Sequence, residues 1–146
     1  MTLSSRLVRE YREYERVSTA VVYAYGGPGS QSVTDSWQGT RYLWHQSMAA
    51  KGYIIASVDN RGTGGRGRDF KNLVYRNLGE WEATDQMEAA RHMASLPYVD
   101  RARIGIWGWS YGGYLSALTL MKGGDLFRAG IAVAPVTDWR LYDTIY

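Results

Sequence analysis

The residues with the clearest chemical potential lie in the stretch "GWSYGGY", residues 108–114. It contains a G-x-S-x-G motif, in which a serine between a strand and a helix exposes its hydroxyl as a nucleophile. Ser110 is that serine. The alternative is an ordinary glycine-rich turn between a strand and a helix. A serine hydroxyl needs an imidazole nearby to take its proton. The chain has only His45 and His92, both before the serine, so the motif predicts a nucleophile whose general base is not obvious.

Residues around Ser110 supply what a hydrolase serine needs to stabilise a tetrahedral intermediate. The glycines at 108, 112 and 113 keep the turn free of side chains that would clash. The backbone N–H of Tyr111 opens the following helix and is a natural oxyanion donor. A second donor usually comes from the loop after an earlier strand, here "YGGPGSQ", residues 25–31. The phenol of Tyr25 suits that role, or Tyr25 simply ends a strand before a Gly-Pro turn.

An aromatic segment, "PVTDWRLYDTIY", ends the chain at residues 135–146. Thr137 or Asp138 is a good N-cap, and Trp139, Tyr142 and Tyr146 then share one face of the predicted helix. This helix would leave the same sheet edge as Ser110, where α/β proteins bind ligands. Its rings therefore predict either a substrate pocket or ordinary core packing.

A competing motif, "GTGGRG" at residues 62–67, matches the G-x-G-x-x-G of dinucleotide-binding proteins. It follows a predicted strand and precedes helical spacing over residues 70–78. The expected second strand, ending in an acidic residue about 20 positions later, is replaced by a helix start, "GEWEATDQMEAARHM". A connecting or active-site loop is the better interpretation.

The elements that must hold these residues form an alternating pattern. Short apolar runs that are nearly continuous indicate parallel strands covered on both faces, and stretches with helical spacing separate them. We therefore predict an α/β fold with a mostly parallel sheet and flanking helices. The expected strands are residues 17–25, 53–58, 103–108 and 129–135. Residues 1–16 differ from this pattern, with arginines and glutamates interleaved at helical spacing, and read as a solvated surface helix or, less readily, a membrane-surface or partner-binding helix.

Composition narrows the function classes. The 146 residues suffice for about one domain, and the net charge of +3 is too small to indicate a nucleic-acid partner. The chain contains no cysteine, which leaves the cellular compartment open. It also has no apolar run long enough for a membrane span. Nothing in the composition indicates a cofactor or a metal.

Taken together, these motifs resemble the catalytic domain of the prolyl oligopeptidase family, in its dipeptidyl peptidase IV branch. The resemblance runs from about Val21 to Tyr146, and Trp109 before the serine is typical of this branch. It rests on segments that match in order and spacing: "YGGPGSQ", "VDNRGTGGRG", "LGEWEATDQMEAA", "LPYVDRARIGIWGWSYGG" and "VAPVTDWRLYDTIY".

The resemblance implies a role for each matching residue. Ser110 would be the nucleophile, with Tyr25 and Tyr111 forming the oxyanion hole. A pocket for a penultimate proline or alanine of a peptide substrate would be formed by Tyr111, Val136, Trp139, Tyr142 and Tyr146. The implied fold is a partial α/β-hydrolase domain over residues 17–146, preceded by an atypical segment at 1–16.

The chain also departs from the family pattern. The family's catalytic Asp and His follow the aromatic helix, whereas no histidine follows Ser110 here. Asp125, Asp138 and Asp143 do not match the catalytic acid, and we interpret His45 and His92 as surface or packing residues. We therefore expect part of a serine peptidase that is inactive alone and exposes residues 129–135 as a sheet edge open to association. A non-catalytic peptide-binding module and, less favoured, a dinucleotide-binding domain are the alternatives.

Overall fold

A parallel sheet of four strands organises the protein, for which a computed structural model describes residues 17–143. The strand order is β2-β1-β3-β4, and every neighbouring pair is parallel. The strands are β1 (Ser18–Tyr23), β2 (Ile54–Ser57), β3 (Val99–Trp109) and β4 (Ala129–Val133). The parallel α/β fold predicted from the apolar runs is confirmed. The predicted segment 1–16 lies outside the described residues.

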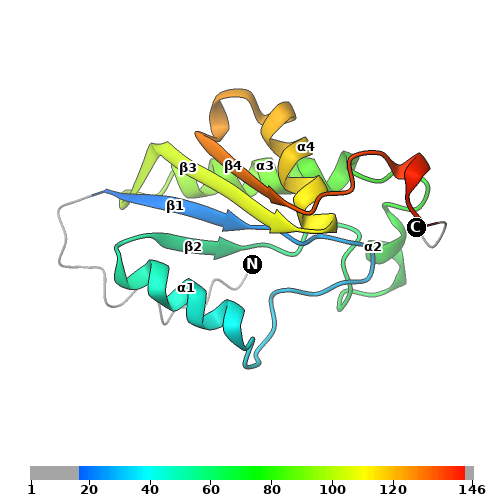
Figure 1. Cartoon of the computed structure of the whole chain (residues 1–146), viewed down its shortest axis with the longest axis horizontal. Coiled ribbons are helices and arrows are strands. Elements are labelled where there is room, and N and C mark those ends of the chain that lie inside the picture. Colours follow the sequence, from blue (N-terminus) through cyan, green and yellow to red (C-terminus); the bar gives the residue numbers. More distant parts are fainter. Residues whose placement is uncertain (1–16, 144–146) are drawn as a thin grey trace.

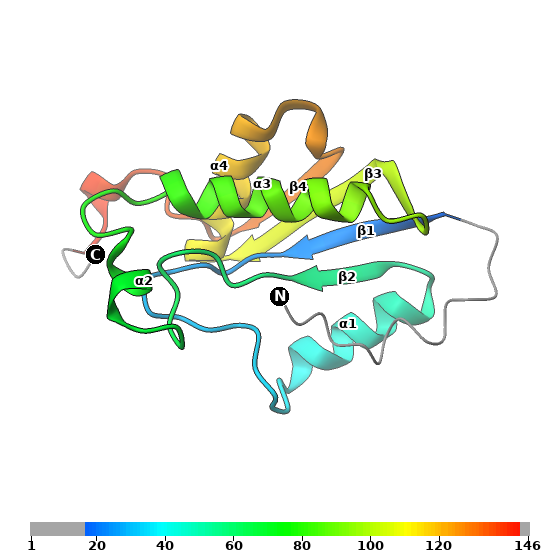
Figure 2. The same ribbon diagram turned by 180° about the vertical axis from the view of Figure 1, so that it is seen from behind.

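Helices cover the two faces of the sheet (Figures 1 and 2). The long ones are α1 (Thr40–Ala50), α3 (Glu80–Ala94) and α4 (Tyr111–Gly123), and α2 (Arg68–Asn72) is short. Helix α1 lies on one face beside β2, while α3 and α4 pack on the other. Among the described residues, no helix combines the length and the apolar character that crossing a membrane requires.

The core lies between the sheet and the α3–α4 layer. Small and branched side chains dominate it, which lets helices approach a sheet closely. Ala20 and Val22 of β1, Ile106 of β3, Ala90 of α3 and Leu115 of α4 are all buried there. Burying both faces of the central strands explains why their sequences read as unbroken apolar runs.

Two predicted helices are much shorter in the structure. The helical spacing over residues 70–78 gives only the five residues of α2 followed by turns. In the aromatic segment, helix covers only a 3-10 turn, η2 (Trp139–Leu141), and Tyr142 is already extended, with φ −107° and ψ 177°. The prediction of an aromatic helix across residues 139–143 was therefore wrong. Asp138 does cap the turn, accepting the N–H of Arg140 at 3.0 Å.

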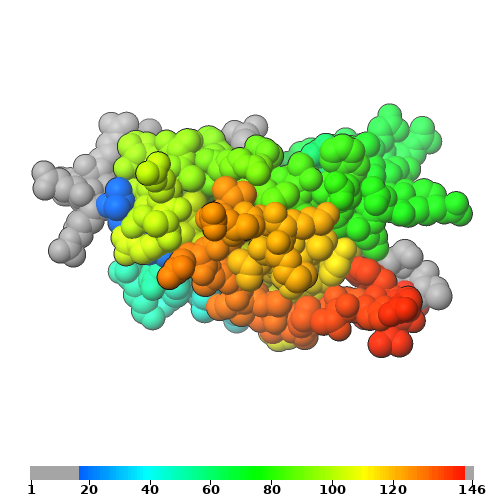
Figure 3. Space-filling model, turned by 90° about the horizontal axis from the view of Figure 1, so that it is seen from above, coloured from blue at the N-terminus to red at the C-terminus, as the bar shows by residue number. Residues whose placement is uncertain are grey.

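Strand β4 forms one edge of the described sheet, pairing only with β3. Its first four residues are exposed, and Ile131 retains 62% of its accessible surface. Figure 3, which looks onto the α4 side, shows the residues after α4 in orange and red along one flank of the molecule. An apolar strand is thus open to solvent beside the Ser110 turn.

Candidate active site

Ser110 lies in the turn between β3 and α4, at the edge of the sheet to which all four strands point (Figure 1). Its backbone has φ 56° and ψ −117°, a conformation that residues other than glycine rarely adopt. The Ser110 N–H donates to the carbonyl of Val133 at 2.9 Å, and the Ser110 carbonyl accepts the Tyr114 N–H at 3.0 Å. A strained serine at a helix N-terminus has the backbone geometry of a nucleophile elbow.

The glycines beside Ser110 are required by close backbone packing. A Cβ at Gly108 would collide with the carbonyl oxygens of Ala24 and Gly112. A Cβ at Gly112 would meet the Ala24 carbonyl and lie 2.9 Å from the Tyr25 Cα, and one at Gly113 would lie 2.6 Å from the Val133 oxygen. The expectation that side chains would clash here is confirmed. The same contacts press the Tyr25 segment directly against the serine turn.

Tyr25 and Tyr111, the two predicted oxyanion donors, flank a common glycine. A Cβ at Gly27 would lie 3.2 Å from Tyr25 Cε1 and 3.2 Å from Tyr111 Cγ. Tyr111 is the first residue of α4, so its N–H belongs to the positive end of the helix dipole. Tyr25 is half-buried, whereas Tyr111 is fully buried. The fold therefore brings together the residues that the sequence singled out from two distant segments.

The "GTGGRG" loop supports the Tyr25 loop. Gly29 N–H donates to the Gly62 carbonyl at 2.9 Å, and Gly64 N–H donates to the Ser30 carbonyl at 2.7 Å. A Cβ at Gly64 would lie 2.7 Å from the Gly29 oxygen, so close contact between two loops requires this glycine. Only the short α2 follows the motif. These contacts give Gly64 a structural role, and together with the short α2 they weaken the case for a dinucleotide site.

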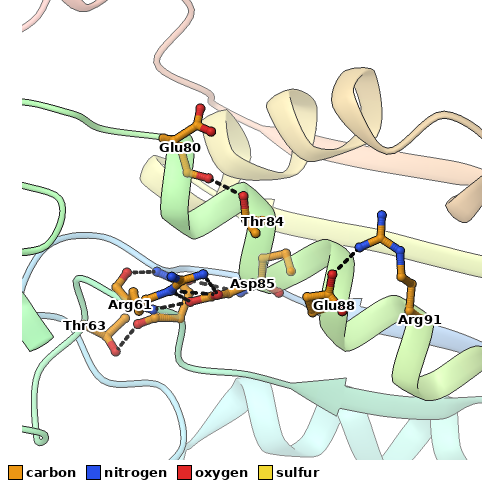
Figure 4. A network of polar contacts seen from close by, with 9 residues as sticks. Arg61, Thr63, Glu80, Thr84, Asp85, Glu88 and Arg91 are labelled. Carbon is orange, nitrogen blue, oxygen red and sulfur yellow. Dashed lines mark hydrogen bonds and ion pairs between the residues drawn. The ribbon is translucent and has the colours of Figure 1, made fainter.

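An ion pair joins the same loop to α3 (Figure 4). The Arg61 guanidinium pairs with Asp85 at 2.5 Å, and the Arg61 backbone N–H also donates to Asp85 at 2.7 Å. The guanidinium carbon lies 4.1 Å from the ring centre of Trp81. Thr63 closes the turn by donating to the Asn60 carbonyl at 2.7 Å. The strand-to-helix connection after β2 is thereby fixed to α3.

A buried carboxyl group on α3 reaches the residue next to the serine, which the sequence did not reveal. Glu82 accepts a hydrogen bond from the Tyr111 hydroxyl at 2.7 Å and another from the Gly79 N–H at 2.9 Å. Burial raises the pKa of Glu82 above its ordinary value, and the Tyr111 hydrogen bond opposes that effect. An acidic residue three positions after a helix start would only have suggested a cap.

The aromatic segment packs beside Tyr111. The Trp139 ring centre lies 5.5 Å from that of Tyr111, 5.1 Å from Tyr114 and 5.7 Å from Tyr142. Val136 is half-buried and Tyr142 exposed, and Tyr146 lies outside the described residues. Burial also raises the pKa of Tyr114. Tyr114, one helical turn after Ser110, belongs to this ring cluster and was missed because its spacing reads as an ordinary helix position.

Comparisons with known proteins identify the family to which this chain belongs. The sequence profile described as "Prolyl oligopeptidase family" matches residues 39–146. The chain belongs to the prolyl oligopeptidase family. It is 50% identical over 125 residues to a protein named "Probable dipeptidyl-aminopeptidase B" from Arthroderma gypseum, and 48% identical over 123 residues to a "Probable dipeptidyl peptidase 4" from Aspergillus flavus. The crystal structure of Porphyromonas gingivalis dipeptidyl peptidase 4 matches with a TM-score of 0.83 at 50% identity.

These prolyl oligopeptidase relatives are much longer than the present chain. The alignments cover 85% of this chain with A. gypseum, 84% with A. flavus and 90% with P. gingivalis. The same alignments cover 13% of the A. gypseum protein, 16% of the A. flavus protein and 18% of the P. gingivalis protein. The chain thus spans less than a fifth of the relatives' length. The resemblance to the dipeptidyl peptidase IV branch is confirmed for the portion that this chain covers.

Neither histidine of the chain lies near the serine turn. His45 lies on α1, across the sheet from α4, where its ring packs 5.6 Å from Tyr23 and 6.4 Å from Trp107. Burial and the nearby Arg41 lower the pKa of His45. His92 is exposed in the last turn of α3. Within residues 17–143, no hydrogen bond links either imidazole to the Ser110 side chain.

The acidic residues near the end of the chain are equally unsuited to a triad. Asp125 and Asp143 are exposed, and Asp138 is engaged by Arg140, which holds the pKa of the Asp138 carboxyl below its ordinary value. Across the described part of the chain, no three His, Asp or Glu side chains come together as metal ligands would. The structure therefore brings together Ser110, the predicted nucleophile, Tyr25 and Tyr111, the predicted oxyanion donors, and the rings around Trp139.

Proposed function

We propose that these residues form the nucleophile and substrate-binding part of a serine peptidase that releases dipeptides carrying proline or alanine in second place. The observation that carries the proposal is the Ser110 turn, whose positive φ and glycine contacts hold the serine against the Tyr25 segment. Membership of the prolyl oligopeptidase family supports the peptide substrate class. The named activity of the P. gingivalis relative supports dipeptide release.

In the proposed reaction, Ser110 Oγ attacks the scissile carbonyl carbon of a peptide. Its proton passes to a general base, and the carbonyl oxygen becomes an oxyanion. The Tyr111 N–H and the Tyr25 hydroxyl would donate hydrogen bonds to that oxyanion, and one such donor is typically worth about 3 kcal/mol. Collapse of the tetrahedral intermediate expels the amine as the acyl-enzyme forms, and water then releases the dipeptide.

The ring cluster beside Tyr111 accounts for the proposed preference. Proline presents a compact apolar ring and no N–H, so its pocket needs apolar walls rather than hydrogen-bond partners. Trp139 lies 5.5 Å from Tyr111 and 5.7 Å from Tyr142, which sets aromatic faces next to the nucleophile turn. We assign the pocket to Tyr111, Val136, Trp139 and Tyr142, with Tyr146 beyond the described residues.

The general base is proposed to come from outside residues 1–146, because His45 and His92 lie away from the turn. Removing the catalytic histidine of an unrelated serine protease lowers turnover on the order of a million-fold. The purified 146-residue chain should therefore release no measurable product from a Gly-Pro chromogenic substrate. Product formation that disappears in Ser110→Ala would contradict this assignment of the base.

A segment exchange tests the proposal directly. Residues 17–143 would replace the aligned segment of P. gingivalis dipeptidyl peptidase 4, which is 50% identical. We expect the chimera to cleave Gly-Pro substrates and its Ser110→Ala variant to be inactive. Xaa-Pro peptide binding by a folded chimera without any cleavage would favour the alternative of a non-catalytic peptide-binding module.

A further inference from the structure

Two polar side chains of α3, Glu82 and Gln86, are completely buried, each with 0% of its surface exposed. They lie four residues apart, so they occupy adjacent positions on the same face of the helix. Burial of a carboxyl and an amide is costly unless each finds hydrogen-bond partners. Glu82 pairs directly with Tyr111, and Gln86 pairs with Asn60, which in turn contacts the Tyr25 loop.

Glu82 connects α3 to the residue after the nucleophile. One carboxyl oxygen accepts the Tyr111 hydroxyl at 2.7 Å, and the other accepts the Gly79 N–H at 2.9 Å. Tyr111 retains only 1% of its surface, so protein atoms enclose its ring on all sides. Glu82 therefore holds the hydroxyl end of the Tyr111 side chain, and the backbone N–H of the same residue is the proposed oxyanion donor.

Gln86 connects the same helix to the Tyr25 loop through Asn60. Its amide nitrogen donates to Asn60 Oδ1 at 3.0 Å and to the Val58 carbonyl at 3.1 Å. The Asn60 amide then donates to the Gly26 carbonyl at 3.1 Å. Gly26 has φ 73°, and a Cβ there would collide with Asn60 Oδ1, so the amide and the loop backbone are in direct contact. The next residue toward the N-terminus is Tyr25.

We propose that Glu82 and Gln86 are positioning residues that fix the separation of the two oxyanion donors, Tyr111 and Tyr25. The inference rests on the proposed function, because it assumes that Tyr111 and Tyr25 donate hydrogen bonds to the oxyanion. Oxyanion donors must lie about 2.7–3.1 Å from the developing charge. A single helix connected by buried hydrogen bonds to both segments, directly to Tyr111 and through Asn60 to the Tyr25 loop, maintains that separation better than two independent loops.

The test uses two-dimensional NMR of the whole 146-residue chain. Glu82→Gln should shift the amide resonances of Ser110 and Tyr111 by several times the change caused by Glu88→Gln, a matched control on the exposed side of α3. Gln86→Met should instead shift Tyr25 and Gly26. Should Glu82→Gln fail to fold, Tyr111→Phe breaks the same hydrogen bond from the other side.

The outcomes separate positioning from a helix-capping role. If Glu82→Gln and Tyr111→Phe move only resonances near Gly79, Glu82 is a cap and the inference is wrong. If Gln86→Met leaves Tyr25 and Gly26 at control level, the second connection is wrong. In the active chimera, Glu82→Gln should lower kcat about tenfold with KM nearly unchanged. A chimera that never cleaves overturns the proposed function, while the NMR shifts still decide this inference.

Discussion

The Ser110 turn and the aromatic segment at residues 136–142 lie side by side but are held in different ways. Backbone atoms enclose the turn, since added Cβ atoms at Gly108 and Gly112 would strike the Ala24 carbonyl. The aromatic segment is held by ring contacts and one capped 3-10 turn, and Tyr142 remains exposed. The proposed nucleophile is therefore enclosed by backbone, whereas the proposed pocket wall depends mainly on side-chain packing and a single short turn.

The largest effect should come from filling the enclosed turn. Gly108→Ala places a methyl group against two backbone carbonyl oxygens, and backbone cannot move aside without opening the sheet. We expect a loss of about 4 kcal/mol or more in the free energy of unfolding. Gly105→Ala on the same strand is the matched control, because its Cβ would sit 3.4 Å from the nearest atom. Equal melting temperatures for the two variants in calorimetry would show that the turn is not enclosed.

The next effect concerns β4. Its Val133 carbonyl accepts the Ser110 N–H, and its outer edge pairs with no other strand of the described sheet. The exposed strand should pair with other copies of the chain, since unpaired apolar edges template association. Light scattering should show mass that increases with protein concentration, and Ile131→Lys should reduce it. A wild-type chain that stays monomeric at all concentrations would refute this expectation.

A smaller effect on stability is expected in the aromatic segment. Trp139→Ala removes contacts with Tyr111, Tyr114 and Tyr142, but the indole is only half-buried. The free energy of unfolding should fall by about 1 kcal/mol. In the chimera, kcat/KM for a Gly-Pro substrate should fall by about tenfold, equivalent to roughly 1.4 kcal/mol. A loss of stability as large as that of Gly108→Ala would erase the contrast between the regions.

The smallest effect is a pH dependence of opposite sign in the two regions. Because the pKa of buried Glu82 is raised, its contribution favours the fold below its ordinary value of 4.5 and diminishes as pH rises through the folded value. The pKa of Asp138 is lowered by Arg140, so its contribution is present above 3.8 and is lost as pH falls. Melting temperatures of Glu82→Gln and Asp138→Asn relative to wild type, from pH 3 to 8, should change in opposite directions. Parallel profiles would contradict the assigned environments.

The sequence predicts the enclosed turn better than the pocket wall for a physical reason. Gly108, Ser110 and Gly112 encode a local backbone geometry, so their spacing alone indicates the structure. The predicted aromatic helix is wrong over residues 139–143, where Trp139 packs against Tyr111 and Tyr114 and Tyr142 takes an extended backbone. Such contacts are nonlocal, and no spacing rule reports them.

The hydrogen bonds that Glu82 and Gln86 of α3 make to distant segments could not be predicted from the sequence for the same reason. Glu82 and Gln86 belong to a segment that the sequence identifies only as a helix start, yet both are buried against distant segments. The "GTGGRG" glycines likewise matched a phosphate-binding motif, whereas in the structure Gly64 and Gly65 contact the Tyr25 loop. In each case the partner lies more than twenty residues away, so the role becomes readable only in three dimensions.

Covalent labelling of Ser110 tests the central claim that this chain holds a nucleophile whose base lies elsewhere. A fluorophosphonate reacts when serine oxygen attacks phosphorus, fluoride departs and the general base takes the proton. Mass spectrometry should find Ser110 phosphonylated in the P. gingivalis chimera and unmodified in the 146-residue chain treated alike. Equal labelling of both would place the base within these residues, and labelling of neither would remove Ser110 as the nucleophile.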